Sequence, residues 1–534
     1  VIFLGLAILT TRELLLYLNP QTKEIKGFWL FVSSFLISFG ATTILMLWIP
    51  TPSYNFLNYT SLLLFSWGAV KLTRNLSDTI PINSKISAFK PYFGWLLIAI
   101  AGYLSFAARP FTAVILIILI FIWAIFKKPF PYKGILFAAL LSLAGLFVTA
   151  ILVDGSFSAF IARYLTAKEE LEILGSHQAT ALFSIVLSYV LLFINFKFVL
   201  VFFLFFLAGV AINYTEKYEK TLSNLSVPLV ALTLFIIYLS VYPYLLWHNA
   251  FAGYYLWAPL AGIAVYGAWK DKFPLLNKND LYRPLFALLL LLPLAYGVGS
   301  NNSVLLSLST ACFFTFLSLL IIVRSVTSPE AWPFRLSVIA VLCFIVSCLL
   351  VVNSTGNPYR QPHSLWTFNT KAYVQEGSSE LSFTPFIAEY LNTLHLLSKD
   401  VGFKKETPIF DLSGRAPGVV YALSAYTPKA YWLNSLPSGA NAFALRFLSK
   451  MTCQEISSAW LLWENNPRGR TLSFEILTPF GIEPNDYEIA FVLNYPTDFG
   501  INSFASRAQI LFKPVRDLDS AIQSCEAARK QSGF

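Results

Sequence analysis

Residues 94–126 read GWLLIAIAGYLSFAARPFTAVILIILIFIWAIF, two apolar runs separated by only Arg109 and Pro110. A helix needs about 20 apolar residues to cross a bilayer, and fewer where neighbouring helices shield it. Because proline suits the first turn of a helix, this stretch predicts a tight hairpin of helices over 93–108 and 111–126. Two interpretations of Arg109 at its tip stay open: the side chain can snorkel to the interface or bind the phosphate of an anionic lipid.

Similar apolar runs fill residues 1–353, whereas residues 354–534 have the composition of an ordinary soluble domain. Only 12% of the chain is charged, against roughly 25% in a typical soluble domain. We therefore expect an α-helical polytopic membrane domain with about 12–13 transmembrane helices over residues 1–353, and a small α/β domain over 354–534. The predicted spans are 1–18, 28–49, 55–72, 93–108, 111–126, 134–153, 180–212, 223–247, 252–269, 284–299, 303–323 and 335–353. Residues 180–212 are expected to hold one crossing and a half-inserted segment.

The basic residues between these spans predict their orientation, because cytoplasmic loops carry an excess of Lys and Arg. The same bias accounts for the net charge of +10, and no basic patch on a soluble face suggests nucleic-acid binding. The rule places residues 50–54, 109–110, 154–178, 248–251 and 300–302 outside the cytoplasm, together with the domain that begins near Ser354.

The C-terminal domain alternates between apolar β-like runs and helical stretches, which predicts a small, partly parallel sheet with helices on its faces. The expected strands are Pro408–Leu412, Ala430–Leu433, Ala459–Trp463, Glu488–Leu493 and Gln509–Phe512, and the expected helices are 382–402, 416–427, 440–453 and 515–530. Residues 353–380 are expected to form a linker.

Two further features of the domain leave alternatives open. The turn Asp411–Gly418, DLSGRAPG, can be a purely structural strand–turn–helix connection or can cradle an anion on its backbone N–H groups. Cys453 and Cys525 can form a disulfide if the domain lies outside the cytoplasm, but the sequence does not give the separation of their Cα atoms.

Residues 154–178, DGSFSAFIARYLTAKEELEILGSHQ, form a polar outer segment between apolar spans. Its apolar residues fall at helical spacing, which predicts an amphipathic helix lying on the membrane surface. It is either an interfacial helix with a solvated polar face or a loop that contacts substrate. In the second case cations would hold a phosphate, and a carboxylate or histidine would move a proton. The candidates for phosphate binding are Arg163 and Lys168, and the candidates for catalysis are Glu169, Glu170 and His177.

A second outer segment, WHNAFAGYYLWAP at 247–259, is rich in aromatic residues. An aromatic belt at the membrane–water boundary explains much of it, although aromatic rings next to polar groups also suit the apolar faces of sugars. His248, Tyr254 and Tyr255 are therefore candidate substrate-binding residues. Arg360 and His363 follow the last predicted span on the same side and join them.

This layout resembles the GT-C superfamily of polytopic glycosyltransferases, which use polyprenyl-phosphate-linked sugars and include protein mannosyltransferase-like and aminoarabinose transferase-like enzymes. The resemblance rests on the hairpin with Arg109–Pro110 at its tip, the segment 154–178, the aromatic turn HNAFAGYYLWAP (248–259) and the C-terminal domain. It covers the whole chain, but it is a resemblance of layout. It implies a multi-pass protein of the bacterial inner membrane that transfers a sugar from a polyprenyl-phosphate donor to a glycan, lipid or protein acceptor.

The chain departs from this family at one point. Its members place a catalytic acid in an outer loop after the first helix, whereas here the outer turn PTPSYN after the second predicted span contains no acid. Val1 at the start favours a first helix and loop lying upstream, and the catalytic base with them.

No cofactor is indicated by the sequence, and a divalent metal is left open, since no pair of cysteines has the spacing of metal ligands. Two alternatives to the enzyme remain: a non-enzymatic membrane subunit whose soluble domain docks a partner complex, and a lipid or polysaccharide transporter or polymerase.

Overall fold

The computed structural model describes two compact units. One contains residues Val1–Phe157 and Leu182–Tyr359, and the other contains Ser158–Ala181 and Arg360–Phe534. The residues described are 2–19, 27–46, 53–77, 85–174, 202–204, 206–207, 209–210, 253–271, 282–299, 304–356, 363–375, 379–414, 416–428, 433, 435, 438–465, 471–495 and 507–533.

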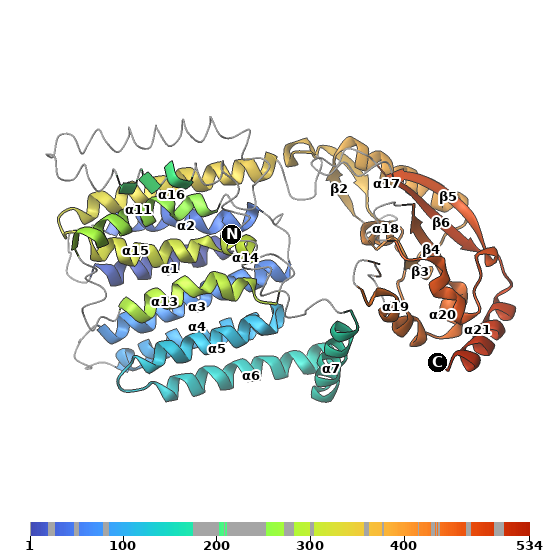
Figure 1. Ribbon diagram of the computed structural model, residues 1–534, viewed down its shortest axis with the longest axis horizontal. Helices are drawn as coiled ribbons and strands as arrows, with labels where there is room; N and C mark the ends of the chain where they lie inside the picture. Colours follow the sequence, from blue (N-terminus) through green and yellow to red (C-terminus); the bar gives the residue numbers. More distant parts are fainter. Residues whose placement is uncertain are drawn as a thin grey trace. The chain divides into compact units, whose positions relative to one another are not determined.

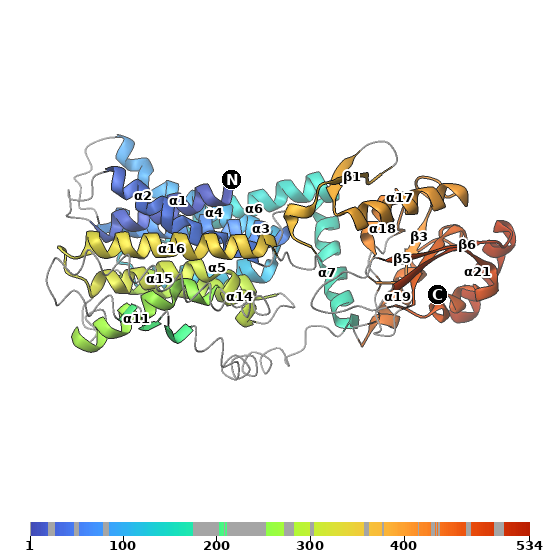
Figure 2. The ribbon, with the colours of Figure 1, turned by 90° about the horizontal axis from the view of Figure 1, so that it is seen from above.

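The first unit is a bundle of helices (Figures 1 and 2), which lie alongside one another with their long axes in nearly the same direction. Its elements are α1 (Ile2–Leu18), α2 (Gly27–Ser38), the 3-10 helix η1 (Phe39–Met46), α3 (Tyr54–Ser77), α4 (Lys85–Ala108), α5 (Pro110–Ile125), α6 (Tyr132–Asp154), α11 (Tyr254–Asp271), α13 (Tyr282–Gly297), α14 (Val304–Thr310), α15 (Cys312–Ser325) and α16 (Trp332–Gly356). The predicted hairpin is confirmed, with Arg109 as the N-cap of α5 and Pro110 at its first position. The spans predicted over 180–212 and 223–247 lie largely outside the described residues.

Two predicted spans differ from the observed elements. The stretch expected as one helix over 28–49 is α2 followed by η1, and the stretch over 303–323 is α14 and α15, which break at Ala311. Gly40 lets η1 pack closely against α15. A Cβ at this position would lie 3.0 Å from the ring of Phe313.

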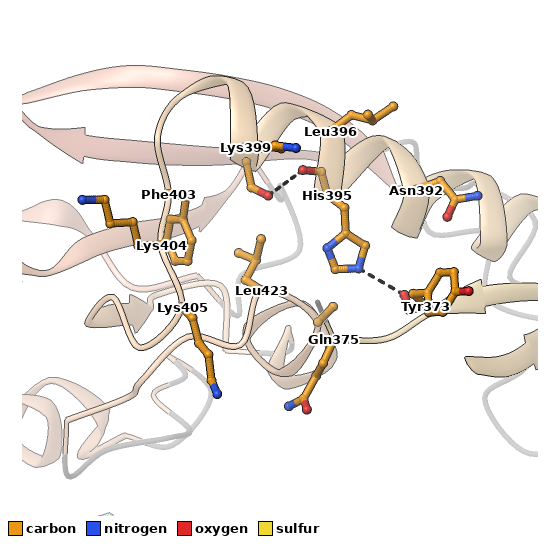
Figure 3. Close-up of a pocket in the computed structure, with 12 residues that line it drawn as sticks. Tyr373, Gln375, Asn392, His395, Leu396, Lys399, Phe403, Lys404, Lys405 and Leu423 are labelled. Atoms are coloured by element: carbon orange, nitrogen blue, oxygen red, sulfur yellow. Dashed lines mark hydrogen bonds between the residues drawn. The ribbon is translucent and has the colours of Figure 1, made fainter. Parts of the chain in front are cut away.

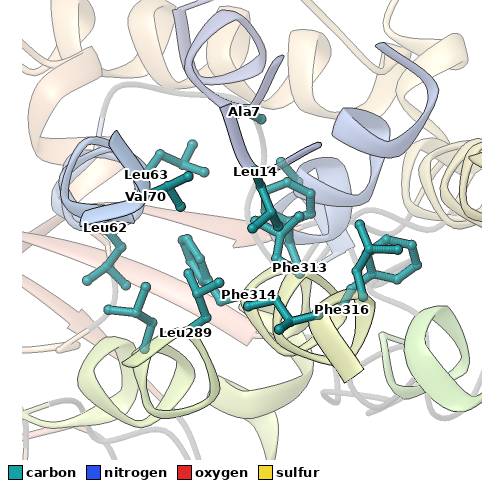
Figure 4. Packing of buried hydrophobic residues seen from close by; sticks show 14 of the residues in the cluster. Ala7, Leu14, Leu62, Leu63, Val70, Leu289, Phe313, Phe314 and Phe316 are labelled. Carbon is teal, nitrogen blue, oxygen red and sulfur yellow. The ribbon is translucent and has the colours of Figure 1, made fainter. Parts of the chain in front are cut away.

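Helices α3 and α4 pack at close range through small residues. A Cβ on Gly68 would lie 2.8 Å from the carbonyl oxygen of Gly94, and the hydroxyls of Ser61 and Ser105 are 2.7 Å apart. Small residues and hydroxyl hydrogen bonds of this kind are typical of helix interfaces in membranes. The core of the unit continues through Leu14, Leu63, Phe313 and Phe314, which are fully buried (Figure 4).

Several helices of this unit are long and apolar, and many of their apolar side chains are exposed. Three stretches among the described residues are long and apolar enough to cross a membrane: Gly27–Leu45, Tyr132–Asp154 and Trp332–Gly356. Helix α6 buries only Gly134, Ala138 and Ala150, while Leu143 is 61% exposed and Leu152 is 79% exposed. An apolar surface of this extent is unfavourable in water and favourable in lipid.

The second unit is a small α/β domain together with α7 (Phe157–Leu174), of which all but the first residue belongs to this unit. The C-terminal elements are η3 (Leu365–Thr367), β1 (Thr370–Tyr373), β2 (Glu380–Phe383), α17 (Pro385–Asp400), β3 (Ile409–Asp411), α18 (Pro417–Ala422), α19 (Ala440–Ser449), α20 (Cys453–Ser458), β4 (Trp460–Glu464), η4 (Phe474–Phe480), η5 (Pro484–Asp486), β5 (Tyr487–Tyr495), β6 (Arg507–Pro514) and α21 (Leu518–Ser532).

The main sheet has the strand order β3-β4-β6-β5, in which β3 and β4 are parallel and the other pairs are antiparallel. Side chains alternate between its two faces. Phe410 and Leu461 pack with α19, α20 and α21, whereas Ile409 and Leu462 pack with α17 and α18. Figure 2 shows α17 and α18 on one side of the strands and α19 and α21 on the other. The partly parallel sheet with helices on both faces is confirmed.

Two local predictions for this unit have clear outcomes. The disulfide between Cys453 and Cys525 is confirmed, with Cα atoms 5.6 Å apart. The linker expected over 353–380 is wrong in part, because α16 continues to Gly356 and β1 pairs with β2 as an antiparallel hairpin. The strand predicted at Ala430–Leu433 lies mostly outside the described residues.

Candidate functional site

The amphipathic helix predicted within 154–178 is present as α7, and it starts immediately after the long apolar helix α6. Gly155 caps α6 in the left-handed conformation, with φ of 74°, which glycine adopts without a steric penalty. Only Gly155 and Ser156 separate the two helices. If α6 crosses a bilayer, α7 therefore begins within two residues of the membrane surface.

One side of α7 carries an exposed apolar stripe. Phe157, Ile161 and Leu165 are 49%, 42% and 58% exposed, and their spacing of four residues places them one above another on the helix. At about 100° per residue, Lys168 falls on the same side as this stripe. Its ammonium group is 3.9 Å from the carboxylate of Glu172, and both side chains are well exposed, so the ion pair is weak.

Arg163 lies on a different side of α7 from this stripe. Its guanidinium group is 5.6 Å from the ring of Phe160 and 5.7 Å from the ring of Tyr164. Cation–π contacts of this kind orient the guanidinium. Of the two cations on α7 predicted to bind phosphate, Lys168 is the one that shares a side with the apolar stripe.

The acidic side of α7 contacts α19. Glu169 forms an ion pair with Arg446, and Glu170 forms one with Lys450 at 3.3 Å. Arg446 and Lys450 are four residues apart and so lie on one face of α19. A third contact is made by backbone, because a Cβ on Gly439 would lie only 1.6 Å from the carbonyl oxygen of Ile173. Residues 169 to 173 thus contact α19 both on the face of Arg446 and Lys450 and at its N-cap, Gly439.

These contacts bear on the predicted catalytic roles of Glu169 and Glu170. Each carboxylate is engaged by a cation, and together they attach α7 to the α/β domain. Both carboxylates are used in these contacts, so the geometry supports a positioning role for them. The third catalytic candidate, His177, lies outside the described residues, as do His248 and Arg360.

Arg109 is buried in the helical unit, with only 6% of the residue exposed. Its guanidinium donates hydrogen bonds to the carbonyl oxygen of Tyr296, at 2.7 Å, and to the side-chain oxygen of Asn55. It also lies 5.2 Å from the ring of Tyr54 and 5.3 Å from the ring of Tyr296. The guanidinium is neither at the surface nor presented to lipid among the described residues. Its contacts tie α3, α5 and α13 together.

Tyr254 and Tyr255 are also buried, at 8% and 1% exposure. The hydroxyl of Tyr254 donates to the carbonyl oxygen of Leu305 at 2.8 Å, and its ring is 5.9 Å from that of Trp257. The backbone around Gly253 approaches Ser309 closely enough to exclude a Cβ. These contacts fix the start of α11 against α14 and support a packing role for the two tyrosines.

His363 belongs to the α/β unit, where its ring stacks on Phe386 with centroids 6.0 Å apart and planes inclined by 16°. Phe386 itself is 51% exposed. The structure therefore distributes the predicted site residues over two units. Within the described residues it brings together only those on α7, and it joins them with Arg446 and Lys450, which the sequence did not indicate.

The backbone of the turn after β3 binds a side chain of the protein itself, Asp411. The carboxylate of Asp411 accepts hydrogen bonds from the backbone N–H groups of Ser413 (3.0 Å) and Ala416 (3.1 Å) and from the Ser413 hydroxyl. The N–H groups that an external anion would need are thus occupied by the turn's own side chain. Burial nevertheless raises the pKa of Asp411 to about 6, outweighing the effect of these donors. The structural interpretation of the turn is the one these contacts support.

One buried carboxylate was missed by the sequence analysis. Glu13 of α1 is 7% exposed and pairs with Lys71 at 3.2 Å and Arg74 at 2.8 Å, both on α3. Its signal in the sequence was a single acid within an apolar run. Because both oxygens contact cations, Glu13 fastens α1 to α3.

The described residues contain no group of three or more His, Cys, Asp or Glu side chains placed to hold a metal ion. Comparison with known proteins adds no assignment: no protein-family model, no curated protein and no solved structure matches this chain.

Proposed function

We propose that this protein is an integral-membrane glycosyltransferase that takes a sugar from a polyprenyl-phosphate donor and acts at the outer face of the membrane. The observation that carries the proposal is the junction of α6 and α7. A long apolar helix leads within two residues into a surface helix with an exposed apolar stripe and an exposed cation, Lys168. A lipid-linked phosphate sits at this same depth, where acyl chains give way to water.

The case for the membrane rests on exposed apolar surface. Along α6, large aliphatic side chains such as Leu143 and Leu152 are exposed, and on α5 Ile117 and Ile125 are 55% and 67% exposed. A soluble monomer rarely exposes contiguous apolar surface of this extent. Lipid supplies the environment that these helices require.

The case for the outer face rests on the disulfide. Cys453 begins α20 and Cys525 lies on α21, and the bond between them is buried in the α/β unit. Disulfides persist in oxidising compartments and are rare in the cytosol. Helix α7 belongs to the same unit, so an extracytoplasmic α/β domain carries Lys168 and Arg163 to the outer surface with it.

In the proposed reaction the sugar passes from the lipid phosphate to an acceptor hydroxyl. A base removes the hydroxyl proton, and the acceptor oxygen forms a bond to the anomeric carbon. The bond between the anomeric carbon and the phosphate oxygen breaks, and the lipid phosphate leaves with its negative charge. In this proposal Lys168 balances that charge. Arg163 is the second cation on α7. The base is not assigned, since Glu169 and Glu170 are engaged by Arg446 and Lys450.

The test uses the full chain in lipid nanodiscs, with radiolabelled undecaprenyl-phosphate glucose, mannose, galactose and arabinose as donors, and measures release of undecaprenyl phosphate. Lys168→Ala should lower the rate at least tenfold. Lys133→Ala is the matched control, an exposed lysine at the start of α6, and should stay within twofold. No release by the wild-type protein from any of these donors, or equal loss in both variants, would overturn the proposal.

A further inference from the structure

The α/β unit contains a pocket of about 500 Å³, within the range of roughly 300–1,000 Å³ typical of small-molecule sites. It lies between the C-terminal half of α17, the loop that follows it and the end of α18. Its lining includes Tyr373, Gln375, Asn392, His395 and Phe403 together with three lysines, Lys399, Lys404 and Lys405. All of these residues belong to one unit, so the pocket is a property of that unit alone.

Charge is the first clue to its occupant. Among the residues that the structure describes, the lining includes three lysines and no aspartate or glutamate. Two acids adjoin these lysines in sequence, since Asp400 follows Lys399 and Glu406 follows Lys405. The Glu406 side chain is 80% exposed and lies 4.0 Å from Lys405, which makes a weak surface pair. Three cations around one concave site favour an anion.

Part of this lining is held in place. Nε2 of His395 lies 3.1 Å from the carbonyl oxygen of Tyr373, which links α17 to β1. Phe403 packs edge-on against Trp460, with ring centroids 5.0 Å apart. Next to the lining, the carbonyl oxygen of Val401 at the end of α17 accepts a hydrogen bond from Lys513. A lining fixed in this way does not have to be ordered when a ligand binds.

The uncharged residues of the lining indicate which kind of molecule bears the anionic group. Figure 3 shows Phe403, Leu423 and His395 around the centre, with the side chains of Lys405 and Gln375 extending to the same side of it. Asn392 and Gln375 offer amide donors and acceptors for hydroxyl groups. Tyr373 is 56% exposed and Leu396 is 65% exposed, which leaves an apolar edge at the rim. Amides, an aromatic ring and lysines together match a polyhydroxylated ring that bears an anionic group.

We propose that this pocket binds an acidic saccharide, one that carries a carboxylate or a phosphate. Binding of an acidic saccharide is argued from the pocket residues alone. The role of the pocket rests on the proposed function: it recognises the acceptor glycan, separately from the lipid-linked donor at α7.

Binding can be measured by isothermal titration calorimetry on the full chain in nanodiscs, at low salt. The probes are tetragalacturonate for a carboxylate and glucose 6-phosphate for a phosphate, with maltotetraose and glucose as neutral counterparts. At least one acidic probe should bind at least tenfold more tightly than its neutral counterpart. Which of the two binds identifies the anionic group, and binding of neither, or equal binding of acidic and neutral sugars, overturns the proposal.

Variants then locate the site. Lys399→Ala and Lys405→Ala should each lower the affinity for the acidic probe at least fivefold. The control is Lys530→Ala, which removes an exposed lysine of α21 in the same unit and should change the affinity by less than twofold. Equal weakening by all three would mean non-specific attraction and would reject the pocket. Lys168→Ala should leave this binding unchanged, so a failure of the pocket and a failure of the proposed donor site give different results.

Discussion

Arg446 of α19 is ion-paired with Glu169 of α7, a residue 277 positions earlier in the chain. Together with the pair of Lys450 and Glu170, this contact makes a helix from the first third of the sequence part of the C-terminal unit. Both pairs are partly exposed, and each is expected to contribute only about 0.5 kcal/mol. The close backbone approach at Gly439 is the stronger determinant of how α7 sits.

Replacing Gly439 with alanine should loosen α7. The added Cβ would meet the carbonyl oxygen of Ile173 at 1.6 Å, and because that atom belongs to backbone, α7 has to move. Hydrogen exchange of amides in 158–174, followed by mass spectrometry, should become at least tenfold faster. Gly418→Ala is the control, since a Cβ there meets nothing within 4 Å, and unchanged exchange in Gly439→Ala would contradict the packing.

Arg109→Ala should destabilise the helical unit by about 3 kcal/mol, because it leaves the carbonyl of Tyr296 and the side chain of Asn55 buried without their donor. The measurement is thermal unfolding in detergent. The control is Arg12→Ala, which removes an exposed arginine of α1 and should lower the stability of the helical unit only slightly. If Arg109→Ala unfolds like the wild type but loses binding of undecaprenyl phosphate, Arg109 is a ligand-binding residue after all.

Breaking the disulfide with Cys453→Ala should destabilise the α/β unit by about 2–4 kcal/mol. The bond closes a loop with a sequence separation of 72, and its loss enlarges the unfolded ensemble. Alkylation with a polyethylene glycol maleimide should show both thiols protected in wild-type protein purified without reductant. Cys348→Ala is the control, a free cysteine in the helical unit. Full labelling of Cys453 and Cys525 would count against the extracytoplasmic placement.

Asp411 predicts a pH dependence of the α/β unit. Burial raises its pKa from 3.8 to about 6, so the folded state favours the protonated acid. The stabilisation is present in full below pH 4 and is lost as pH rises through 6, by about 2–3 kcal/mol. Asp411→Asn should remove this slope, while Asp519→Asn, an exposed acid of α21, should retain it. The readout is exchange of the β3 amides, corrected for the intrinsic effect of pH.

Much of the fold followed from sequence pattern, for physical reasons. The runs around Ile409, Leu461, Leu493 and Leu511 are apolar and short, which predicts buried strands, and all four fall in the sheet. The hairpin of β1 and β2 was missed because only Ala372 among its eight residues is buried, so its strands carry no hydrophobic signal.

The candidate site was less predictable, because its contacts are distant in sequence. Arg446 and Lys450 on α19 have the spacing of an ordinary solvated helix face, and nothing nearby in sequence points to Glu169. Arg109 could be recognised as the tip of a hairpin. Its burial depends on Tyr296, which lies 187 residues away, and local pattern does not carry that information.

The place of α7 within the C-terminal unit also sets an order of events during synthesis. Glu169 precedes Arg446 by 277 residues, and at about 5–20 residues per second the ribosome takes roughly 15–55 s to cover that distance. For that interval α7 exists without the two cations of α19 that pair with Glu169 and Glu170. A chain that stops before residue 440 never completes the pairing, so this contact forms only after α19 has been synthesised.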